Sequence, residues 1–195
     1  MVVSCRRLFD TGRPQPRQGE LPDALYDHGV TIHAEHPFRE PESDPVRRFR
    51  GRVGGTVSLW TAGDERDRAG LTVTSFLVAG GEDPRVLALL DPDADLTERL
   101  LASGRAVVQL LTWDHRDLAE MFAGTAPAPG GMFRQAEFVA TEWGPRLATA
   151  STWAGVRLES EQPVGWSTLV TTVVEHLEVG DDAEPLRHHR GRYQR

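Results

Sequence analysis

Hydroxyl side chains are concentrated in one apolar segment, Leu71-Thr72-Val73-Thr74-Ser75-Phe76. Hydroxyl and backbone N–H groups along such a segment can bind a ligand that is polar at its edge and apolar on its faces, as a heterocycle is. Threonine also fits an ordinary β-strand, where its hydroxyl bonds the nearby backbone. The residues by themselves leave both interpretations open.

Signatures of self-contained catalytic sites are absent from the sequence. It has no Gly-x-Gly-x-x-Gly, no Walker loop, no Gly-x-Ser-x-Gly and no His-Glu-x-x-His. The single cysteine, Cys5, excludes an intrachain disulfide and any multi-cysteine metal site. His33 and His36 lie among prolines, and the adjacent pair His188 and His189 would point to opposite faces of a strand. We therefore expect no metal site.

Charge and composition restrict the classes of partner. The 195 residues carry 22 basic and 29 acidic side chains, a net charge of −7, which argues against a general binder of nucleic acid or acidic membrane. Lysine and asparagine are absent, so an anionic ligand must be bound by arginine, histidine or backbone N–H groups. The sequence shows neither a secretory signal nor a span of about 18 apolar residues, and we expect a soluble, cytoplasmic protein.

The elements that must position these residues begin after a Pro-rich stretch. We predict an N-terminal extension over residues 1–45, partly mobile, with at most two helical turns at Leu21–Tyr26. Its prolines are Pro14, Pro16, Pro22, Pro37, Pro41 and Pro45. One domain is predicted from residue 46 to residue 195.

Alternating apolar and polar residues predict a mainly β domain. The strands are expected at Thr56–Thr61, Leu71–Val78, Arg85–Asp91, Val107–Leu111, Ala136–Ala140, Trp153–Glu159 and Thr168–Val179. Arg85–Asp91 is almost wholly apolar, which is typical of a strand covered on both sides. Two short helices are expected, one with Asp95 as N-cap and ending at Gly104, the other from Asp114 to Gly124. The hairpin-like order of the strands predicts a β-barrel with short α-helices.

Several of these segments occur in an order found in a known family. They are Val57–Gly63, Gly70–Phe76, Asp83–Asp91, Leu100–Gly104, Val107–Leu111, Arg116–Gly124 and the closing segment Pro185–Tyr193. Together, over about residues 45 to 193, they resemble the flavin-reductase-like family of FMN-binding split barrels.

The resemblance implies a homodimer that binds FMN, or FAD, near the subunit interface. It further implies hydride transfer from NAD(P)H to flavin, often for a separate monooxygenase. Carried onto this sequence, the resemblance places one strand segment along the isoalloxazine and ribityl chain: Thr72, Val73, Thr74, Ser75 and Phe76. It places Asp91 and Thr97 near the phosphate. It places His189, as the catalytic residue, and Tyr193 near the flavin or nicotinamide. Such hydride transfer requires no protein nucleophile, so the missing catalytic signatures are compatible with it.

The sequence departs from the family pattern at two places. Where family members commonly have a Ser near the phosphate, this chain has Asp93-Ala94-Asp95, which Arg99, Arg105 or the arginines of residues 47–52 would have to compensate. The family's Gly-Asp-His becomes Gly165-Trp166-Ser167, which weakens the inference of NAD(P)H turnover. The alternatives are a flavin-binding barrel without NAD(P)H turnover, and a related split barrel that binds haem or a deazaflavin.

Overall fold

The computed structural model describes residues 45–181 and 183–195, which belong to one compact unit, Glu40–Arg195. The predicted extension up to residue 44 and the helical turns at Leu21–Tyr26 lie outside the described residues. Within the two described ranges, no helix combines the length and the apolar character that crossing a bilayer requires.

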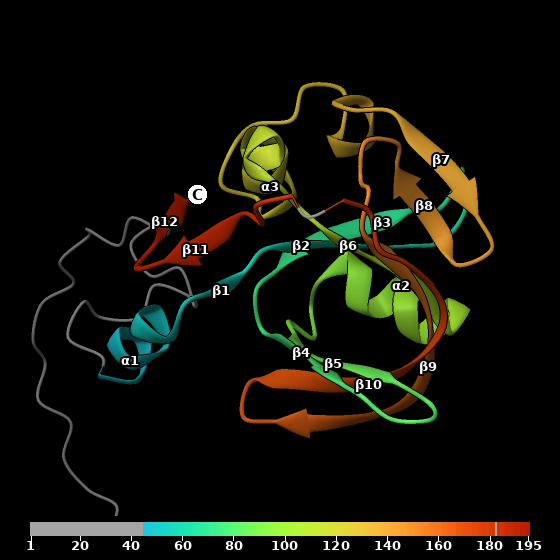
Figure 1. Ribbon diagram of the computed structural model, residues 1–195, viewed down its shortest axis with the longest axis horizontal. Helices are drawn as coiled ribbons and strands as arrows, with labels where there is room; N and C mark the ends of the chain where they lie inside the picture. Colours follow the sequence, from blue (N-terminus) through green and yellow to red (C-terminus); the bar gives the residue numbers. More distant parts are fainter. Residues whose placement is uncertain (1–44, 182) are drawn as a thin grey trace, which may run out of the picture. The chain divides into compact units, whose positions relative to one another are not determined.

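A curled, seven-stranded antiparallel sheet forms the centre of the fold (Figure 1). Its strand order is β3-β2-β6-β9-β10-β5-β4. The strands are β2 (Ser58–Ala62), β3 (Ala69–Val73), β4 (Phe76–Ala79), β5 (Arg85–Leu90), β6 (Arg105–Leu110), β9 (Trp153–Val164) and β10 (Ser167–Glu178). The predicted mainly β barrel with few short helices is confirmed.

The prediction of one continuous strand over Leu71–Val78 is wrong. The chain leaves the sheet at Val73 and re-enters it at Phe76, so that β3 and β4 form its two opposite edges. Thr74 and Ser75 make the crossing between the two edges. Two hydrogen bonds attach Ser75 to β5: the Ser75 hydroxyl donates to the Leu89 carbonyl at 2.7 Å, and the Leu89 N–H donates to the Ser75 carbonyl at 2.9 Å. No glycine or proline interrupts residues 71–78, which is why the residue pattern did not reveal the crossing.

Two helices lie against the sheet and a third precedes it. These are α1 (Pro45–Val53), which the sequence analysis missed, α2 (Asp95–Ser103) and α3 (Arg116–Phe122), the last preceded by a 3-10 turn at Trp113–His115. Gly104 ends α2 as predicted, with φ 69° and its N–H donated to the Leu100 carbonyl at 2.8 Å.

The predicted N-cap of the first expected helix is wrong. Ala94 is the N-cap of α2 and makes no side-chain cap bond, and Asp95 is the first helical residue. The second helix, expected from Asp114, begins at Arg116, and Asp114 lies in the preceding 3-10 turn, which Thr112 caps in a capping box with His115. A helix start shifted by one or two residues leaves the apolar spacing unchanged, so periodicity alone does not locate it.

Shorter strands complete the domain. β1 (Gly55–Thr56), β11 (Arg187–His189) and β12 (Arg192–Gln194) form a three-stranded sheet, and β7 (Phe138–Thr141) pairs with β8 (Gly144–Leu147). A 3-10 turn, Met132–Arg134, lies between α3 and β7. In the view of Figure 1, α1, β1, β11 and β12 lie on the left, and the β7–β8 hairpin lies on the right.

Two buried clusters support these elements. The first fills the inside of the curled sheet under α2 and includes Trp60 and Leu100. The second lies between α3 and β8 and includes Phe122, Leu147 and Leu186. The strand expected to be covered on both sides is covered on one: Ala88 is 2% exposed, whereas Leu89 on the outer face is 40% exposed.

Candidate functional site

The three hydroxyl groups of the predicted ligand segment have different partners. Thr72 Oγ1 donates to the Ala119 carbonyl of α3 at 2.8 Å, and Ser75 Oγ donates to the Leu89 carbonyl. The Thr74 hydroxyl makes no hydrogen bond within residues 45–181 and 183–195. Both readings of the sequence therefore apply, each to different residues: two hydroxyls serve the fold, and Thr74 keeps a hydroxyl available to a ligand.

A pair of glycines brings the crossing close to the C-terminal strands. A Cβ on Gly55 would stand 2.8 Å from the Thr74 carbonyl oxygen, and a Cβ on Gly54 would stand 3.3 Å from Cδ2 of His189. Gly54 also has φ +63°, a conformation that L side chains rarely adopt. Thr74 and His189, far apart in sequence, thus lie on either side of one dipeptide.

A cavity of about 410 Å³ opens beside this dipeptide. Its lining comes from the link between α1 and β1 and from the C-terminal strands: Val53, Gly54, Gly55, Thr56, Arg187, His188, His189 and Gln194. The volume lies within the range of small-molecule sites. Of the predicted site residues, His189 lines the cavity and Thr74 adjoins it through Gly55.

Two titratable groups at this place have shifted pKa values. Burial, and then the neighbouring His189, lower the pKa of His188 below its ordinary value. Burial, and then the carboxylate of Glu120, raise the pKa of Tyr193. Tyr193 packs against the second buried cluster, with its ring centroid 5.4 Å from that of His188. Tyr193 therefore lies behind His188 and outside the residues that line the cavity.

The remaining predicted site residues are mostly committed to the fold. Val73 is buried in the first cluster and accepts the Ser58 hydroxyl bond on its carbonyl at 2.8 Å, and Phe76 packs against the same cluster. Thr97 is 1% exposed, and its hydroxyl donates to the Asp91 carbonyl at 2.6 Å. Asp91 is exposed, and its carboxylate accepts the Asp93 N–H at 3.0 Å.

The start of α2 is acidic. Asp91, Asp93 and Asp95 are all exposed there. The two arginines expected to compensate are engaged elsewhere: Arg99 pairs with Asp67 at 2.5 Å, and Arg105 pairs with Glu142 at 2.9 Å. Within the described residues, no ion pair neutralises the three carboxylates, which disfavours a phosphate at this helix start.

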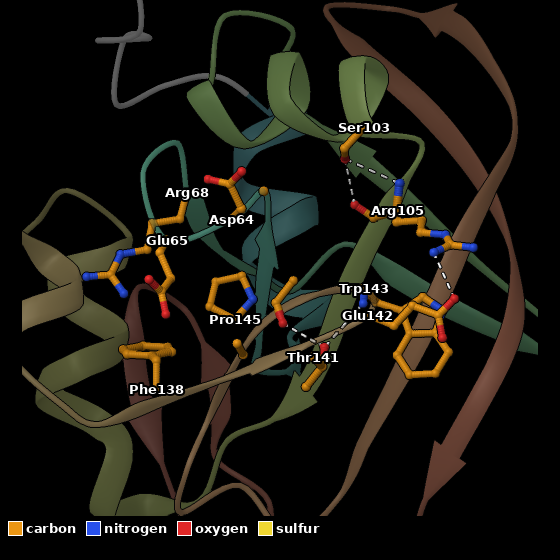
Figure 2. A pocket seen from close by; sticks show the side chains of 13 residues that line it. Asp64, Glu65, Arg68, Ser103, Arg105, Phe138, Thr141, Glu142, Trp143 and Pro145 are labelled. Atoms are coloured by element: carbon orange, nitrogen blue, oxygen red, sulfur yellow. Dashed lines mark hydrogen bonds and ion pairs between the residues drawn. The ribbon is translucent and has the colours of Figure 1, made fainter.

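A larger cavity, of about 720 Å³, contains none of the predicted site residues. Figure 2 shows its walls, which come from the β2–β3 turn, the α2–β6 link and the β7–β8 hairpin. Many of its polar groups bond one another: Arg105 with Glu142, Ser103 Oγ with the Arg105 carbonyl at 3.0 Å, and Thr141 Oγ1 with the Gly144 carbonyl at 2.6 Å.

The sequence analysis missed several residues of the smaller cavity, namely Gly54, Gly55, Arg187, His188 and Gln194. The Gly-Gly pair and the closing run of arginines and histidines were visible signals, but only the tertiary structure brings them together. In the described residues, no group of three or more His, Cys, Asp or Glu side chains could hold a metal ion.

Comparison with known proteins decides the family. The profile of the family described as "Flavin reductase like domain" matches residues 50–195. The chain belongs to this family. The match includes Thr74, the Gly54–Gly55 pair and the whole C-terminal segment that lines the cavity.

Named relatives of this flavin-reductase-family chain agree. It is 31% identical over 149 residues to the reductase component of FADH(2)-dependent resorcinol hydroxylase of a Rhizobium species, covering 76% of this chain and 82% of that protein. It is 30% identical over 165 residues to FMN reductase (NADH) RutF 2 of Methylorubrum extorquens, covering 77% and 92%. Among solved structures, one that shares the fold is the NADH:FAD oxidoreductase SgcE6 of Streptomyces globisporus, in complex with NAD and FAD fragments. Its TM-score is 0.70 and its sequence identity 24%, and the match covers 77% of this chain and 90% of that one.

Proposed function

We propose that this chain is a flavin reductase that transfers hydride from NAD(P)H to FMN or FAD. The observation that carries the proposal is the family match over residues 50–195, with relatives named as flavin reductases. The free hydroxyl of Thr74 beside a cavity supports it, because a flavin ring presents hydrogen-bonding edges between apolar faces.

The hydride chemistry is supplied by the nicotinamide and the flavin when both are bound, so the chain's own task is to bind and orient them. Thr74 would hydrogen-bond the edge of the flavin ring. The buried Val73 and the half-buried Phe76 pack on the first cluster at the two ends of the crossing, which fixes the Thr74 backbone. His189, across the Gly54–Gly55 pair, would be the catalytic residue beside the reacting rings.

The other predicted contacts are proposed in supporting roles. Thr72 and Ser75 hold the crossing against α3 and β5 through their hydroxyls. Thr97 orders the turn after β5 through its bond to Asp91, and Tyr193 supports His188 from the second cluster. These residues would support the fold around the site without contacting the ligand through their own side chains.

We also propose that the enzyme is a homodimer. Cross-strand pairing puts Leu77, Leu87, Leu89, Leu169 and Val173 on the outer face of β4, β5 and β10, which they share with Arg85 and Thr171. Leu77 is 73% exposed and Leu89 40% exposed. An antiparallel sheet usually carries polar residues on a face that meets water, so an apolar outer face favours cover by a second copy.

A separate flavin-dependent monooxygenase is the proposed consumer of the reduced flavin. The relative from Rhizobium is by name the reductase component of a hydroxylase, and the relative from Thermus thermophilus that of 4-hydroxyphenylacetate 3-monooxygenase. We propose a cytoplasmic location, where NAD(P)H is regenerated.

Oxidation of NADH and NADPH by the purified chain, with FMN, FAD or riboflavin added, tests the proposal. We expect consumption of reduced nicotinamide that depends on added flavin. Flavin binding without consumption would instead identify a flavin-binding barrel. Absence of flavin binding, with binding of haem or a deazaflavin, would identify a related split barrel of another function.

A further inference from the structure

The turn of the β7–β8 hairpin is tied to the seven-stranded sheet by one indole ring, that of Trp143. A Cβ on Gly155 of β9 would stand 2.2 Å from Cδ2 of Trp143, so the ring occupies the space that the missing side chain leaves. The Trp143 Nε1–H donates to Oε2 of Glu175 in β10 at 2.9 Å. The glycine and the carboxylate together form a seat for this ring on the face of the sheet opposite the first cluster.

A β-bulge brings a histidine to the same seat. The register between β9 and β10 shifts between Val174 and His176, so Glu175 is the extra residue. Consecutive residues of a regular strand point to opposite faces, whereas here Glu175 bonds the Trp143 indole and His176 stacks on it. The ring centroid of His176 lies 5.3 Å from that of Trp143 and 4.5 Å from that of Trp153. The imidazole therefore contacts two indoles, one on the hairpin turn and one on β9.

The protonation of this imidazole is not fixed by a hydrogen bond at Nε2. Over residues 45–181 and 183–195, Nε2 of His176 is the one buried side-chain nitrogen or oxygen without a hydrogen-bond partner. Such an atom in a folded protein calls for an explanation, because burial without a partner costs free energy. Histidine is also the side chain that changes charge between about pH 5 and pH 8. The groups around the ring must therefore decide which form is favoured.

Charged side chains around the three rings are largely paired with each other. Nε of Arg157 on β9 lies 2.6 Å from Oε1 of Glu175, and Nη1 of Arg105 on β6 lies 2.9 Å from Oε1 of Glu142 in the hairpin turn. These two pairs of opposite charges leave no net attraction or repulsion for a proton on the imidazole.

The other two charged groups contact Trp153. Its Nε1–H donates to Oε2 of Glu178 on β10 at 2.8 Å, and Cζ of Arg146 on β8 lies 5.4 Å from its ring centroid. One is acidic and the other basic, so the charges again offset each other. The indole faces are then the groups that distinguish the two forms of His176, and indole attracts a cation more strongly than any other aromatic side chain.

We propose that His176 is a pH-sensitive clamp for the β7–β8 hairpin. When the imidazole takes up a proton from solvent, its attraction to the two indoles increases and Trp143 is held more firmly on the sheet; when the proton leaves, the hairpin turn is held less firmly. Glu142 and Trp143 line the cavity of about 720 Å³ (Figure 2), so the clamp also controls the mobility of one wall of that cavity. The proposal is independent of flavin binding and of hydride transfer.

Hydrogen–deuterium exchange of the full chain without ligand, at about pH 5.5 and about pH 7.5, tests the clamp. Exchange rates are corrected for their intrinsic pH dependence, and the amides of β5 report opening of the central sheet. Relative to β5, we expect the amides of β7 and β8 to be protected about fivefold more at the lower pH, as for one added cation–π contact. His176→Gln should remove this difference, because glutamine does not titrate.

Two further variants make the test specific. Trp143→Phe keeps a ring on the hairpin but attracts a cation less, so it should reduce the difference, and it serves the test also if His176→Gln does not fold. His115→Gln is the matched control: Nε2 of His115 lies 2.9 Å from Oγ1 of Thr149, just beyond β8, so this histidine also reaches the end of the hairpin. The control should keep the full difference.

The clamp is refuted if the parent hairpin is protected equally at both pH values, or more at the higher one. It is equally refuted if the difference persists in His176→Gln or in full in Trp143→Phe. Loss of the difference in His115→Gln would transfer the effect to that histidine and likewise overturn the proposal.

Discussion

Removing the hydroxyls of Thr72, Thr74 and Ser75 one at a time should separate ligand binding from folding. The variants are Thr72→Val, Thr74→Val and Ser75→Ala, which change strand propensity little. Only the Thr74 hydroxyl is free of partners among the described residues, whereas the other two bond the backbone at 2.8 Å and 2.7 Å. We therefore expect the three variants to behave differently.

Thr74→Val should reduce flavin affinity about fivefold, which corresponds to about 1 kcal/mol for one hydrogen bond. Its melting temperature should equal that of the parent, because no internal bond is lost. Thr72→Val should leave flavin affinity unchanged and cost about 1 kcal/mol of stability, a shift of about 2–4 °C in the melting temperature. The cost stays moderate because the Ala119 carbonyl still accepts the Ala123 N–H at 2.9 Å.

Ser75→Ala should resemble Thr72→Val, with a smaller loss because Ser75 is exposed. Flavin affinity is measured by quenching of flavin fluorescence, and stability by thermal unfolding without ligand. The reasoning is refuted if Thr74→Val binds flavin as the parent does, or if Thr72→Val loses affinity while its melting temperature is unchanged.

Three other perturbations address the charges, the assembly and the pH response. Asp95→Ser removes one of three carboxylates at the start of α2 that no described ion pair neutralises, so we expect the FMN phosphate to bind elsewhere and FMN affinity to stay unchanged. A gain for FMN but not for riboflavin, larger at low salt, would place the phosphate at α2. Sedimentation of the parent should give a mass of about 43 kDa (2 × 21.6 kDa). Leu77→Asp, on the exposed outer face, should shift the protein to the monomer. A monomeric parent would contradict the proposed interface. Burial lowers the pKa of His115, whose Nδ1 accepts the Thr112 N–H at 3.1 Å. The unfolded chain therefore binds this proton more tightly than the folded chain. The free energy of unfolding should fall as pH drops below 6.5, the ordinary pKa of histidine. His115→Gln should flatten that part of the pH profile, and an unchanged slope would exclude His115 as its source.

Sequence reasoning located most strands because a short run of apolar and β-branched residues between turn residues is a local feature, also where, as in β2, both faces of the strand are buried. Leu59 and Trp60 in β2 and Val107 and Val108 in β6 lie in strands where the pattern predicted them. β9 and β10 run further than predicted at their hairpin ends, where residues 159–166 are exposed and carry little apolar signal. α1 was missed because its apolar residues Val46, Phe49 and Val53 are exposed and separated by arginines, so the segment lacks the buried apolar face that marks a helix packed on a core.

The candidate site was only half visible for a related reason. The segment Leu71–Phe76 was correctly singled out as rich in hydroxyls, but the sequence did not distinguish the free hydroxyl of Thr74 from the bonded ones of its neighbours. That distinction depends on Ala119 and Leu89, which are 47 and 14 residues away from their partners. Hydrogen-bond partners at such separations are set by packing, and no local pattern encodes them.

What the sequence determined by itself is the family, the mainly β class and the chemistry available to bind anions, since a chain without lysine must use arginine, histidine or backbone N–H groups. The tertiary structure decided where those groups meet. Curling of the sheet places β3 and β4 at opposite edges and forces the chain to cross at Thr74, beside Gly55. The Arg190 N–H, which donates to the Gly51 carbonyl, joins the C-terminal segment to α1. Closing so long a loop is affordable because its entropic cost grows only slowly with its length.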